Sequence, residues 1–229
     1  MTTVLLVRHG VTDANRGGVL AGWTPGVHLA DKGREQALAL AARLAPVPVA
    51  AIVTSPLDRC VETAEALAAG RELTVETDDD LGECKYGDWT GQELKKLAKD
   101  PLWKVVQAHP SAATFPGGEA LRDTQARAVD AVRRINERLG PDATWIAVSH
   151  GDVIKSLLAD ALGLHLDQFQ RIHVDPCSLS VVRYTTLRPF VVRMNDLGGS
   201  VADLVPPAKK SRAKRPSSDA VVGGGAGSA

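Results

Sequence analysis

The sequence contains few of the residues on which disulfide-rich, zinc-binding or membrane-spanning proteins are built. Its three cysteines, Cys60, Cys84 and Cys177, stand far apart and form no CxxC pair. An odd, scattered set argues against a disulfide framework or a zinc cluster and is typical of a reducing compartment. No stretch approaches the roughly 18 consecutive apolar residues of a membrane span. The N-terminus also lacks the pattern of a secretory signal, so we expect a cytoplasmic protein without membrane association.

Net charge is also absent, although the charges are unevenly placed. The 229 residues include 27 Lys/Arg and 27 Asp/Glu, but from Pro206 onward there are five basic residues and one acid. Because residues 1–205 are therefore slightly acidic, we expect no general affinity for nucleic acid, and an anion would have to bind in a local pocket. The length predicts one α/β domain, residues 1–200, followed by a disordered tail, residues 201–229, that is basic and then rich in Gly, Ala and Ser.

Short apolar runs alternate with amphipathic helical patterns along the chain. Buried strands are predicted at 4–7, 49–54, 73–77 and 144–148, and an edge hairpin at 179–184 and 190–194. Helical patterns lie at 31–44, 59–67, 93–99 and 119–139 and after 151. This alternation predicts a three-layer α/β/α sandwich with a mostly parallel sheet and helices on both faces. Proline and glycine interrupt residues 100–118, which we expect to be a less regular insertion covering the site.

The first apolar run ends abruptly in Arg8, His9 and Gly10. In open α/β sheets, ligands bind outside the C-terminal ends of the strands. A guanidinium beside an imidazole suits an anion that must be both held and attacked, and Gly10 would allow a tight turn or a close approach to a ligand. Two interpretations are open at this point. His9 is a nucleophile toward phosphate, or the strand ends with two polar residues that face solvent.

Polar residues also follow the other predicted strands. Arg59 follows the second strand, Glu83 follows the third, and His150 directly follows the fourth. Because parallel strands share one C-terminal edge, these residues would meet Arg8 and His9 there. Residues scattered along the sequence thereby become one candidate site.

Four segments carry recognisable motifs in a fixed order. They are Leu6–Gly10 with Thr12 and Asn15, Ser55-Pro56 with Arg59, Thr63 and Ala64, Glu83 before Tyr86-Gly87 and Trp89–Gly91, and Ser149-His150-Gly151. Together they resemble the histidine phosphatase superfamily, branch 1, the phosphoglycerate-mutase-like proteins, over residues 3–195. The overall pattern is similar to an actinobacterial group labelled as phosphomutases, some of whose members resemble acid phosphatases.

The resemblance implies a phosphoglycerate-mutase-like fold and a role for each candidate residue. Arg8 and Arg59 would make charge-assisted hydrogen bonds to phosphoryl oxygens. His9 would attack phosphorus and form a phosphohistidine, while His150 would donate to the equatorial oxygens. Glu83 would protonate the leaving alkoxide and then activate water against the phosphohistidine. The substrate site would also include Asn15, as a neutral donor, Gly22 and Gly151.

Several departures from the mutases of this family favour hydrolysis. Those mutases carry a long capping insertion with an Arg pair in a loop between the acid and the second histidine. Here Glu83 and His150 are 67 residues apart, and the only Arg pair between them, Arg133-Arg134, falls in a predicted helix. Ala21 also stands where a hydroxyl residue is common in the mutases. We therefore expect a phosphomonoester hydrolase.

Two alternatives are retained. Within enzymes, the alternative is a 2,3-bisphosphoglycerate-primed phosphoglycerate mutase or another phosphomutase. In another class, it is a catalytically silent regulatory protein that binds phosphate esters. The intact set of candidate residues argues against the second alternative.

The expected partner is a small-molecule phosphomonoester. No metal and no other cofactor is expected, since two arginines and a second histidine supply the positive potential. Within Pro101–Glu119, a candidate lid, the side chains of Trp103, His109 and Phe115 are available to contact substrate. The hairpin near 179–194 could pair between subunits, which makes a homodimer an open expectation.

Overall fold

The computed structural model describes residues 1–198, and the predicted tail, residues 201–229, lies outside the described residues. The strands are β1 Thr2–Arg8, β2 Ala51–Thr54, β3 Val75–Thr77, β4 Thr144–Ser149, β5 Leu179–Tyr184 and β6 Pro189–Asp196. The α-helices are α1 Asp13–Gly17, α2 Asp31–Leu44, α3 Asp58–Ala68, α4 Leu94–Leu97, α5 Pro101–Ala108, α6 Leu121–Leu139 and α7 Gly151–Ala161. Short 3₁₀ turns are η1 Asp79–Leu81, η2 Gly87–Trp89, η3 Pro110–Ala112 and η4 Leu166–Arg171.

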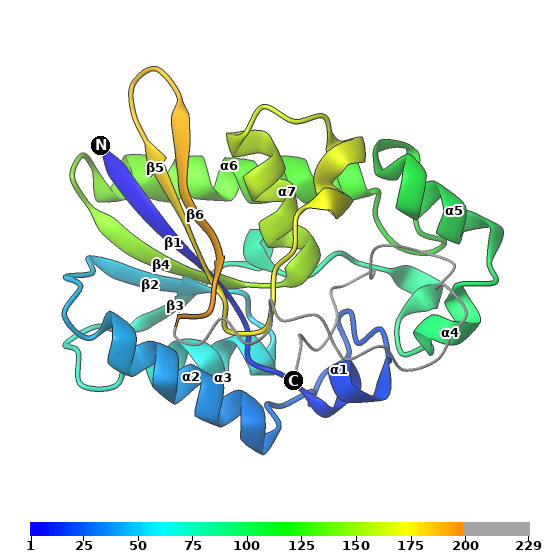
Figure 1. Ribbon diagram of the computed structural model, residues 1–229, viewed down its shortest axis with the longest axis horizontal. Coiled ribbons are helices and arrows are strands. Elements are labelled where there is room, and N and C mark those ends of the chain that lie inside the picture. Colours follow the sequence, from blue (N-terminus) through cyan, green and yellow to red (C-terminus); the bar gives the residue numbers. More distant parts are fainter. Residues whose placement is uncertain (199–229) are drawn as a thin grey trace, which may run out of the picture.

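The strands form one six-stranded sheet in the order β3-β2-β4-β1-β5-β6 (Figure 1). β1 to β4 run parallel, whereas β5 pairs antiparallel with β1 and β6 pairs antiparallel with β5. The helical crossovers between the first four strands account for the parallel part, because a parallel connection has to cross the sheet. The prediction of a mostly parallel sheet with a hairpin at one edge is confirmed.

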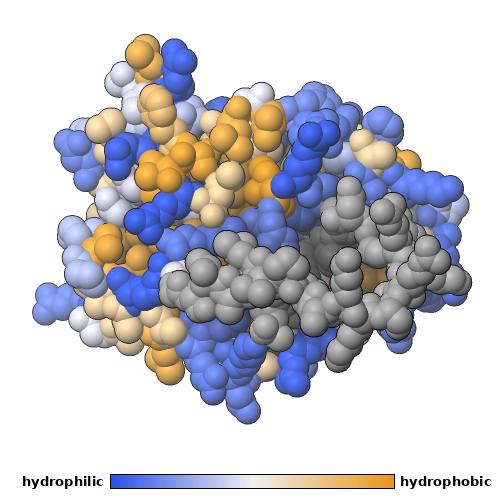
Figure 2. Space-filling model, in the orientation of Figure 1, coloured by the Kyte–Doolittle hydropathy of each residue, from blue (hydrophilic) through white to orange (hydrophobic). Residues whose placement is uncertain are grey.

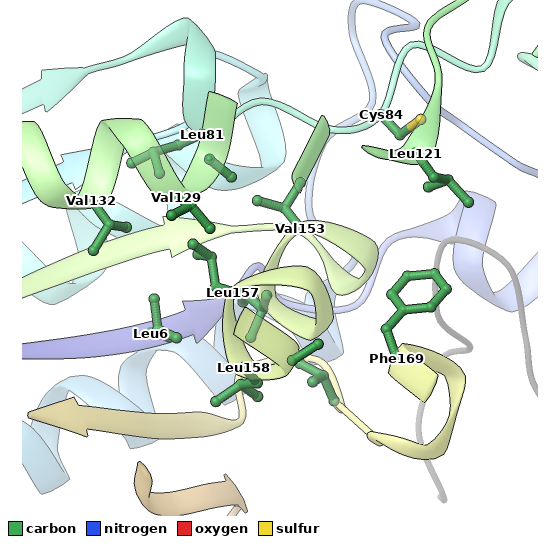
Figure 3. Packing of buried hydrophobic residues seen from close by; sticks show 14 of the residues in the cluster. Leu6, Leu81, Cys84, Leu121, Val129, Val132, Val153, Leu157, Leu158 and Phe169 are labelled. Atoms are coloured by element: carbon green, nitrogen blue, oxygen red, sulfur yellow. The ribbon is translucent and has the colours of Figure 1, made fainter. Parts of the chain in front are cut away.

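Helices cover both faces of the sheet, which confirms the predicted three layers (Figure 1). Successive side chains of a strand point to opposite faces. Thus Leu5 and Val7 of β1 pack in the cluster formed with α2 and α3, while Val4 and Leu6 pack in the cluster formed with α6 and α7. Figure 3 shows Leu6 facing side chains of α6 and α7. Because both faces of the sheet are covered, a residue of β1 can reach a ligand only at the ends of the strand.

The segment 100–118 is more regular than the sequence indicated. Asp100 accepts a hydrogen bond from the backbone N–H of Leu102, and Pro101 occupies the first turn of α5. Pro101 and Pro110 thus start helical segments rather than interrupt them, because proline is pre-organised for the first helical position. Trp103 and Phe115 are 7% and 1% exposed and pack around Trp89. The expectation that their side chains are available to a substrate is therefore wrong.

Exposed apolar side chains gather at the hairpin edge of the molecule. Figure 2 shows them over β6 and the end of α7, and they include Leu162, Leu164, Phe190, Val192 and Met194. This is the surface at which the expected pairing between subunits would occur, and that pairing stays a prediction. Of the helices within residues 1–198, none combines the length and the apolar composition needed to cross a membrane.

Candidate active site

Five polar side chains meet at the C-terminal edge of the parallel strands. β1 ends in Arg8 and leads to His9, and β4 leads to His150, whose ring centroid lies 5.2 Å from that of His9. The register of β1 against β4 sets this distance, because it places the residues that follow the two strands side by side. Arg59 on α3 and Glu83 after η1 complete the group, which we call the strand-end site. All five residues are at most 4% exposed, so the alternative of polar strand ends facing solvent is wrong.

The ring of His9 has a defined orientation and charge. Its Nδ1 lies 2.7 Å from the carbonyl oxygen of Gly10, so Nδ1 carries the proton and Nε2 keeps its lone pair. Burial, and then the charges of Arg59 and Arg8, lower the pKa of His9 well below its usual range. His9 is therefore a neutral imidazole with a lone pair on Nε2.

Gly10 fixes the chain after His9 through a close approach to α2. A Cβ on Gly10 would lie 2.6 Å from the carbonyl oxygen of Gly33, and a Cβ on Gly33 would overlap the carbonyl oxygen of Val11. The backbone N–H of Gly10 also donates to Thr63 Oγ1 on α3. The glycine thus serves a backbone contact between the site and α2.

Arg59 reaches into the site from the first turn of α3. Its Nη2 donates to the carbonyl oxygen of Gly22 at 2.8 Å and lies 3.3 Å from His150 Nδ1. Its Nη1 is buried and has no hydrogen-bond partner among residues 1–198. A buried guanidinium N–H left unpaired costs free energy, so this atom is suited to an anionic acceptor.

His150 is oriented by the motif that precedes Arg59. Its Nε2 lies 2.8 Å from Ser55 Oγ, and its Nδ1 faces Arg59 and Glu83. Burial, and then the charge of Arg59, lower the pKa of His150 well below its usual range. The ring is therefore neutral, with Nε2–H donating to the hydroxyl of Ser55 and Nδ1 accepting from Arg59.

The carboxyl group of Glu83 lies against His150. Its Oε1 accepts the backbone N–H of Cys84 at 3.0 Å, and its Oε2 lies 3.8 Å from His150 Nδ1. Burial, and then the negative charge of Asp152, raise the pKa of Glu83 to about 7. A carboxyl group with this pKa is partly protonated near neutral pH, which a general acid requires.

Sequence reasoning missed a buried charged cluster beside the site. Asp152 on α7 accepts a hydrogen bond from the hydroxyl of Tyr86 at 2.8 Å, and Lys155 Nζ lies 3.5 Å from its other oxygen. Lys155 also donates to Gln170 at 2.9 Å. The signal was present in the sequence, as two charged residues one turn apart in the buried, largely apolar start of a helix.

The remaining predicted residues occupy different places. Gly22 supplies the carbonyl oxygen that Arg59 binds, and Gly151 begins α7 directly after His150. The side-chain oxygen of Asn15 accepts from the backbone N–H and the hydroxyl of Thr12, which forms a capping box for α1. Within residues 1–198, these hydrogen bonds do not join Asn15 to the strand-end site.

The arrangement suits the binding and transfer of an anionic group. It combines two guanidinium groups, two neutral imidazoles and one carboxyl group with a raised pKa. Within residues 1–198, no three His, Cys, Asp or Glu side chains are grouped so that they could hold a metal ion. The positive charges of the strand-end site itself are those of Arg8 and Arg59.

Known proteins share the sequence pattern and the fold of this chain. Residues 4–197 match the sequence pattern of the histidine phosphatase superfamily (branch 1). The chain spans 50% of the length of three mycobacterial relatives, among them a bifunctional protein of Mycobacterium tuberculosis, at 35% identity over 189 residues and 80% of this chain.

Other relatives are matched over most of their length. A glucosyl-3-phosphoglycerate phosphatase of Mycolicibacterium vanbaalenii is 32% identical over 173 residues, 72% of this chain and 76% of that protein. A protein of Cronobacter sakazakii named as a probable phosphoglycerate mutase is 31% identical over 187 residues, 80% of this chain and 86% of that protein. The solved structure of Bacillus stearothermophilus YhfR has a TM-score of 0.80 and 32% identity, covering 86% of this chain and 98% of that chain.

Proposed function

Since the chain belongs to branch 1 of the histidine phosphatase superfamily, we propose that it hydrolyses small phosphomonoesters through a phosphohistidine on His9. The observation that carries this proposal is the position of His9. Its neutral ring lies 5.2 Å from that of His150, and the neighbouring Arg59 has a buried, unpaired Nη1 among the described residues. A nucleophile and an unpaired cationic donor side by side are what a phosphoryl group needs.

Binding of the phosphoryl group would use charge that is already in place. Arg59 Nη1 would donate to one phosphoryl oxygen, and the guanidinium of Arg8 would add a second positive charge. A dianion beside His150 favours the protonated form of its ring. The protonated ring of His150 would add positive charge beside the equatorial oxygens, and this interaction strengthens as charge spreads in the transition state.

The reaction has two displacements at phosphorus. His9 Nε2 attacks, the bond between phosphorus and the ester oxygen breaks, and Glu83 gives its proton to the leaving oxygen. The ionised Glu83 then takes a proton from water. That water attacks phosphorus, the bond to His9 breaks, and inorganic phosphate leaves. The raised pKa of Glu83 supports both roles, because the group can give and regain a proton near neutral pH.

Hydrolysis is favoured over a mutase reaction by the place of the Arg pair. Arg133 and Arg134 lie on α6 with about half of each side chain exposed, and they pair with Asp160, Asp78 and Asp80. They therefore contribute nothing to the strand-end site. One of the relatives is named a phosphatase and another a probable mutase, so the two reactions have to be separated by assay.

Phosphoenzyme trapping tests the proposal. The wild-type protein should retain labelled phosphate on histidine after a quench, and the His9→Ala variant should not. Phosphate release should continue in EDTA. With 3-phosphoglycerate and the 2,3-bisphosphate primer, free phosphate should form faster than 2-phosphoglycerate. Faster formation of 2-phosphoglycerate would establish the mutase, and a panel of phosphomonoesters that yields neither phosphate nor phosphoenzyme would leave only the silent binding protein.

A further inference from the structure

The loop that carries Glu83 is held by one side chain of a distant helix. Arg127 on α6 donates from Nη1 to the carbonyl oxygens of Asp80 at 2.7 Å and Gly82 at 2.9 Å. Its Nη2 donates to the carbonyl oxygen of Glu83 at 2.9 Å. Three backbone carbonyls on and just before the candidate acid are thus bound by a single guanidinium.

The other donors of Arg127 fix the guanidinium itself. Nη2 also donates to Glu119 Oε1 at 2.6 Å, and Nε donates to Glu119 Oε2 at 3.1 Å. A guanidinium has five N–H groups in a rigid fork, and these five bonds use all of them. With Arg127 and Glu119 only 17% and 16% exposed, this contact is shielded from water.

Glu119 holds the other side of the same loop. Its Oε1 accepts the backbone N–H of Lys85 at 2.8 Å, and its own backbone N–H donates to the carbonyl oxygen of Lys85. Trp23 adds a hydrogen bond from Nε1 to the carbonyl oxygen of Glu83, and it packs so closely on Gly82 that a Cβ there would overlap the ring. The main chain of residues 80–85 is therefore bound on both sides of Glu83.

We propose that Arg127 is the positioning residue for Glu83, held in place by Glu119, and that it sets the distance from the carboxyl group to the leaving oxygen. This inference rests on the proposed role of Glu83 as the acid. The described hydrogen bonds of Arg127 go to Glu119 and to backbone carbonyls. Its positive charge also acts on His150 and Glu83, and Arg127→Lys keeps that charge, so this substitution isolates the effect of the hydrogen bonds to the loop. Misplacing a catalytic group by about 1 Å can cost about 10²-fold in rate.

The chain offers a matched control on the same helix. Arg134 lies two turns after Arg127 and also contacts the segment before Glu83, but through the side chains of Asp78 and Asp80 and with 57% of its own side chain exposed. Both arginines pair α6 with this segment. Only Arg127 binds the backbone that carries the acid.

The test measures kcat/KM, which reports the steps up to formation of the phosphohistidine, for Arg127→Lys and Arg134→Ala with 4-nitrophenyl phosphate and phenyl phosphate. A good leaving group needs little protonation, so it reports binding and attack, whereas a poor one also reports the acid. Arg127→Lys should keep kcat/KM for 4-nitrophenyl phosphate within about threefold and lose about 10- to 10²-fold in kcat/KM for phenyl phosphate. Arg134→Ala should match the wild type on both substrates.

A double variant separates positioning from general damage to the fold. If Arg127 acts through Glu83, adding Arg127→Lys to Glu83→Gln should cost no further activity with phenyl phosphate. Multiplied losses in the double variant, or equal losses of Arg127→Lys on both substrates, would overturn the inference. If Glu83→Gln itself shows no dependence on the leaving group, the proposed acid is wrong instead. Thermal unfolding of Arg127→Lys confirms that the compared proteins are folded.

Discussion

His9 and Glu83 are held by different kinds of structure. His9 follows an interior strand, and backbone contacts fix it from both sides, through pairing with β4 and through Gly10 against Gly33. Glu83 stands on a loop between η1 and η2, and side chains of distant segments hold that loop. The proposed nucleophile is thus positioned by the sheet, whereas the proposed acid is positioned by a small set of polar contacts.

The largest effect on the acid side is expected from Glu83→Gln. This change removes the proton donor without changing the shape of the side chain, so hydrolysis of phenyl phosphate should slow by about 10²–10⁴-fold. The loss with 4-nitrophenyl phosphate should be much smaller, because its leaving group departs without help. The kcat/KM values for the two esters measure the difference, because kcat/KM excludes the later hydrolysis of the phosphohistidine, in which Glu83 would act as base for both. Equal losses would show that Glu83 is not the acid.

The position of His9 should depend instead on the backbone packing between the chain after His9 and α2. Gly33→Ala places a Cβ against the carbonyl oxygen of Val11, so the chain after His9 has to shift. We expect unfolding to become easier by about 1–3 kcal/mol, as for other overpacked sites, and phosphoenzyme formation to slow even with good leaving groups. Chemical denaturation and a burst of 4-nitrophenol measure the two effects. Gly17→Ala serves as the packing control, because Gly17 has no positive φ and a Cβ there would come no closer than 3.9 Å to the atoms around it.

A smaller effect is expected on the pH dependence. The charge of Asp152 raises the pKa of Glu83, so Asp152→Asn should lower that pKa. The first step needs protonated Glu83, and the alkaline fall of the rate with phenyl phosphate should therefore move to lower pH. A pH profile of the initial rate measures the shift. A profile that moves to higher pH, or stays in place while the protein remains folded, would contradict the charge coupling.

The raised pKa of Glu83 should also make the stability of the folded protein depend on pH. The pKa of Glu83 is raised in the folded protein, so the folded state loses stability as pH rises from the ordinary range of a glutamate to about 7. Glu83→Gln removes this loss, and its stability relative to the wild type should be greater at pH 8 than at pH 5. Denaturant unfolding at the two pH values tests this, and an equal difference at both would argue against a buried, uncharged Glu83.

The surroundings of His9 could be predicted from the sequence more completely than those of Glu83. The strand ends at Arg8-His9 and Ser149-His150 could be located because an apolar run followed by polar residues is a local pattern. Glu83 could be located as a candidate, but not Arg127 or Asp152, whose effects depend on contacts with residues more than 40 positions away. No periodicity in the sequence reports such contacts.

In the segment 100–118, the sequence predicted a less regular structure than the protein has. Its prolines and glycines indicated irregular chain, yet Pro101 begins a helix and Phe115 packs in the core. Proline occurs both in irregular chain and at the first position of a helix. Here the neighbouring Asp100 cap distinguishes the two. The apolar residues of this segment belong to the core around Trp89, so substrate recognition by Trp103 and Phe115 has no support in the structure.

Local sequence patterns identify which chemical groups stand at the ends of the strands and the order in which they occur. The parallel order of the strands then makes one site of them, because parallel strands share an edge. The state of each group depends on tertiary packing: Nδ1 of His9 carries the proton, the pKa of Glu83 is raised, and Arg127 binds the loop that carries Glu83. These properties come from burial and from partners far away in the chain, and they exist only after the layers have packed.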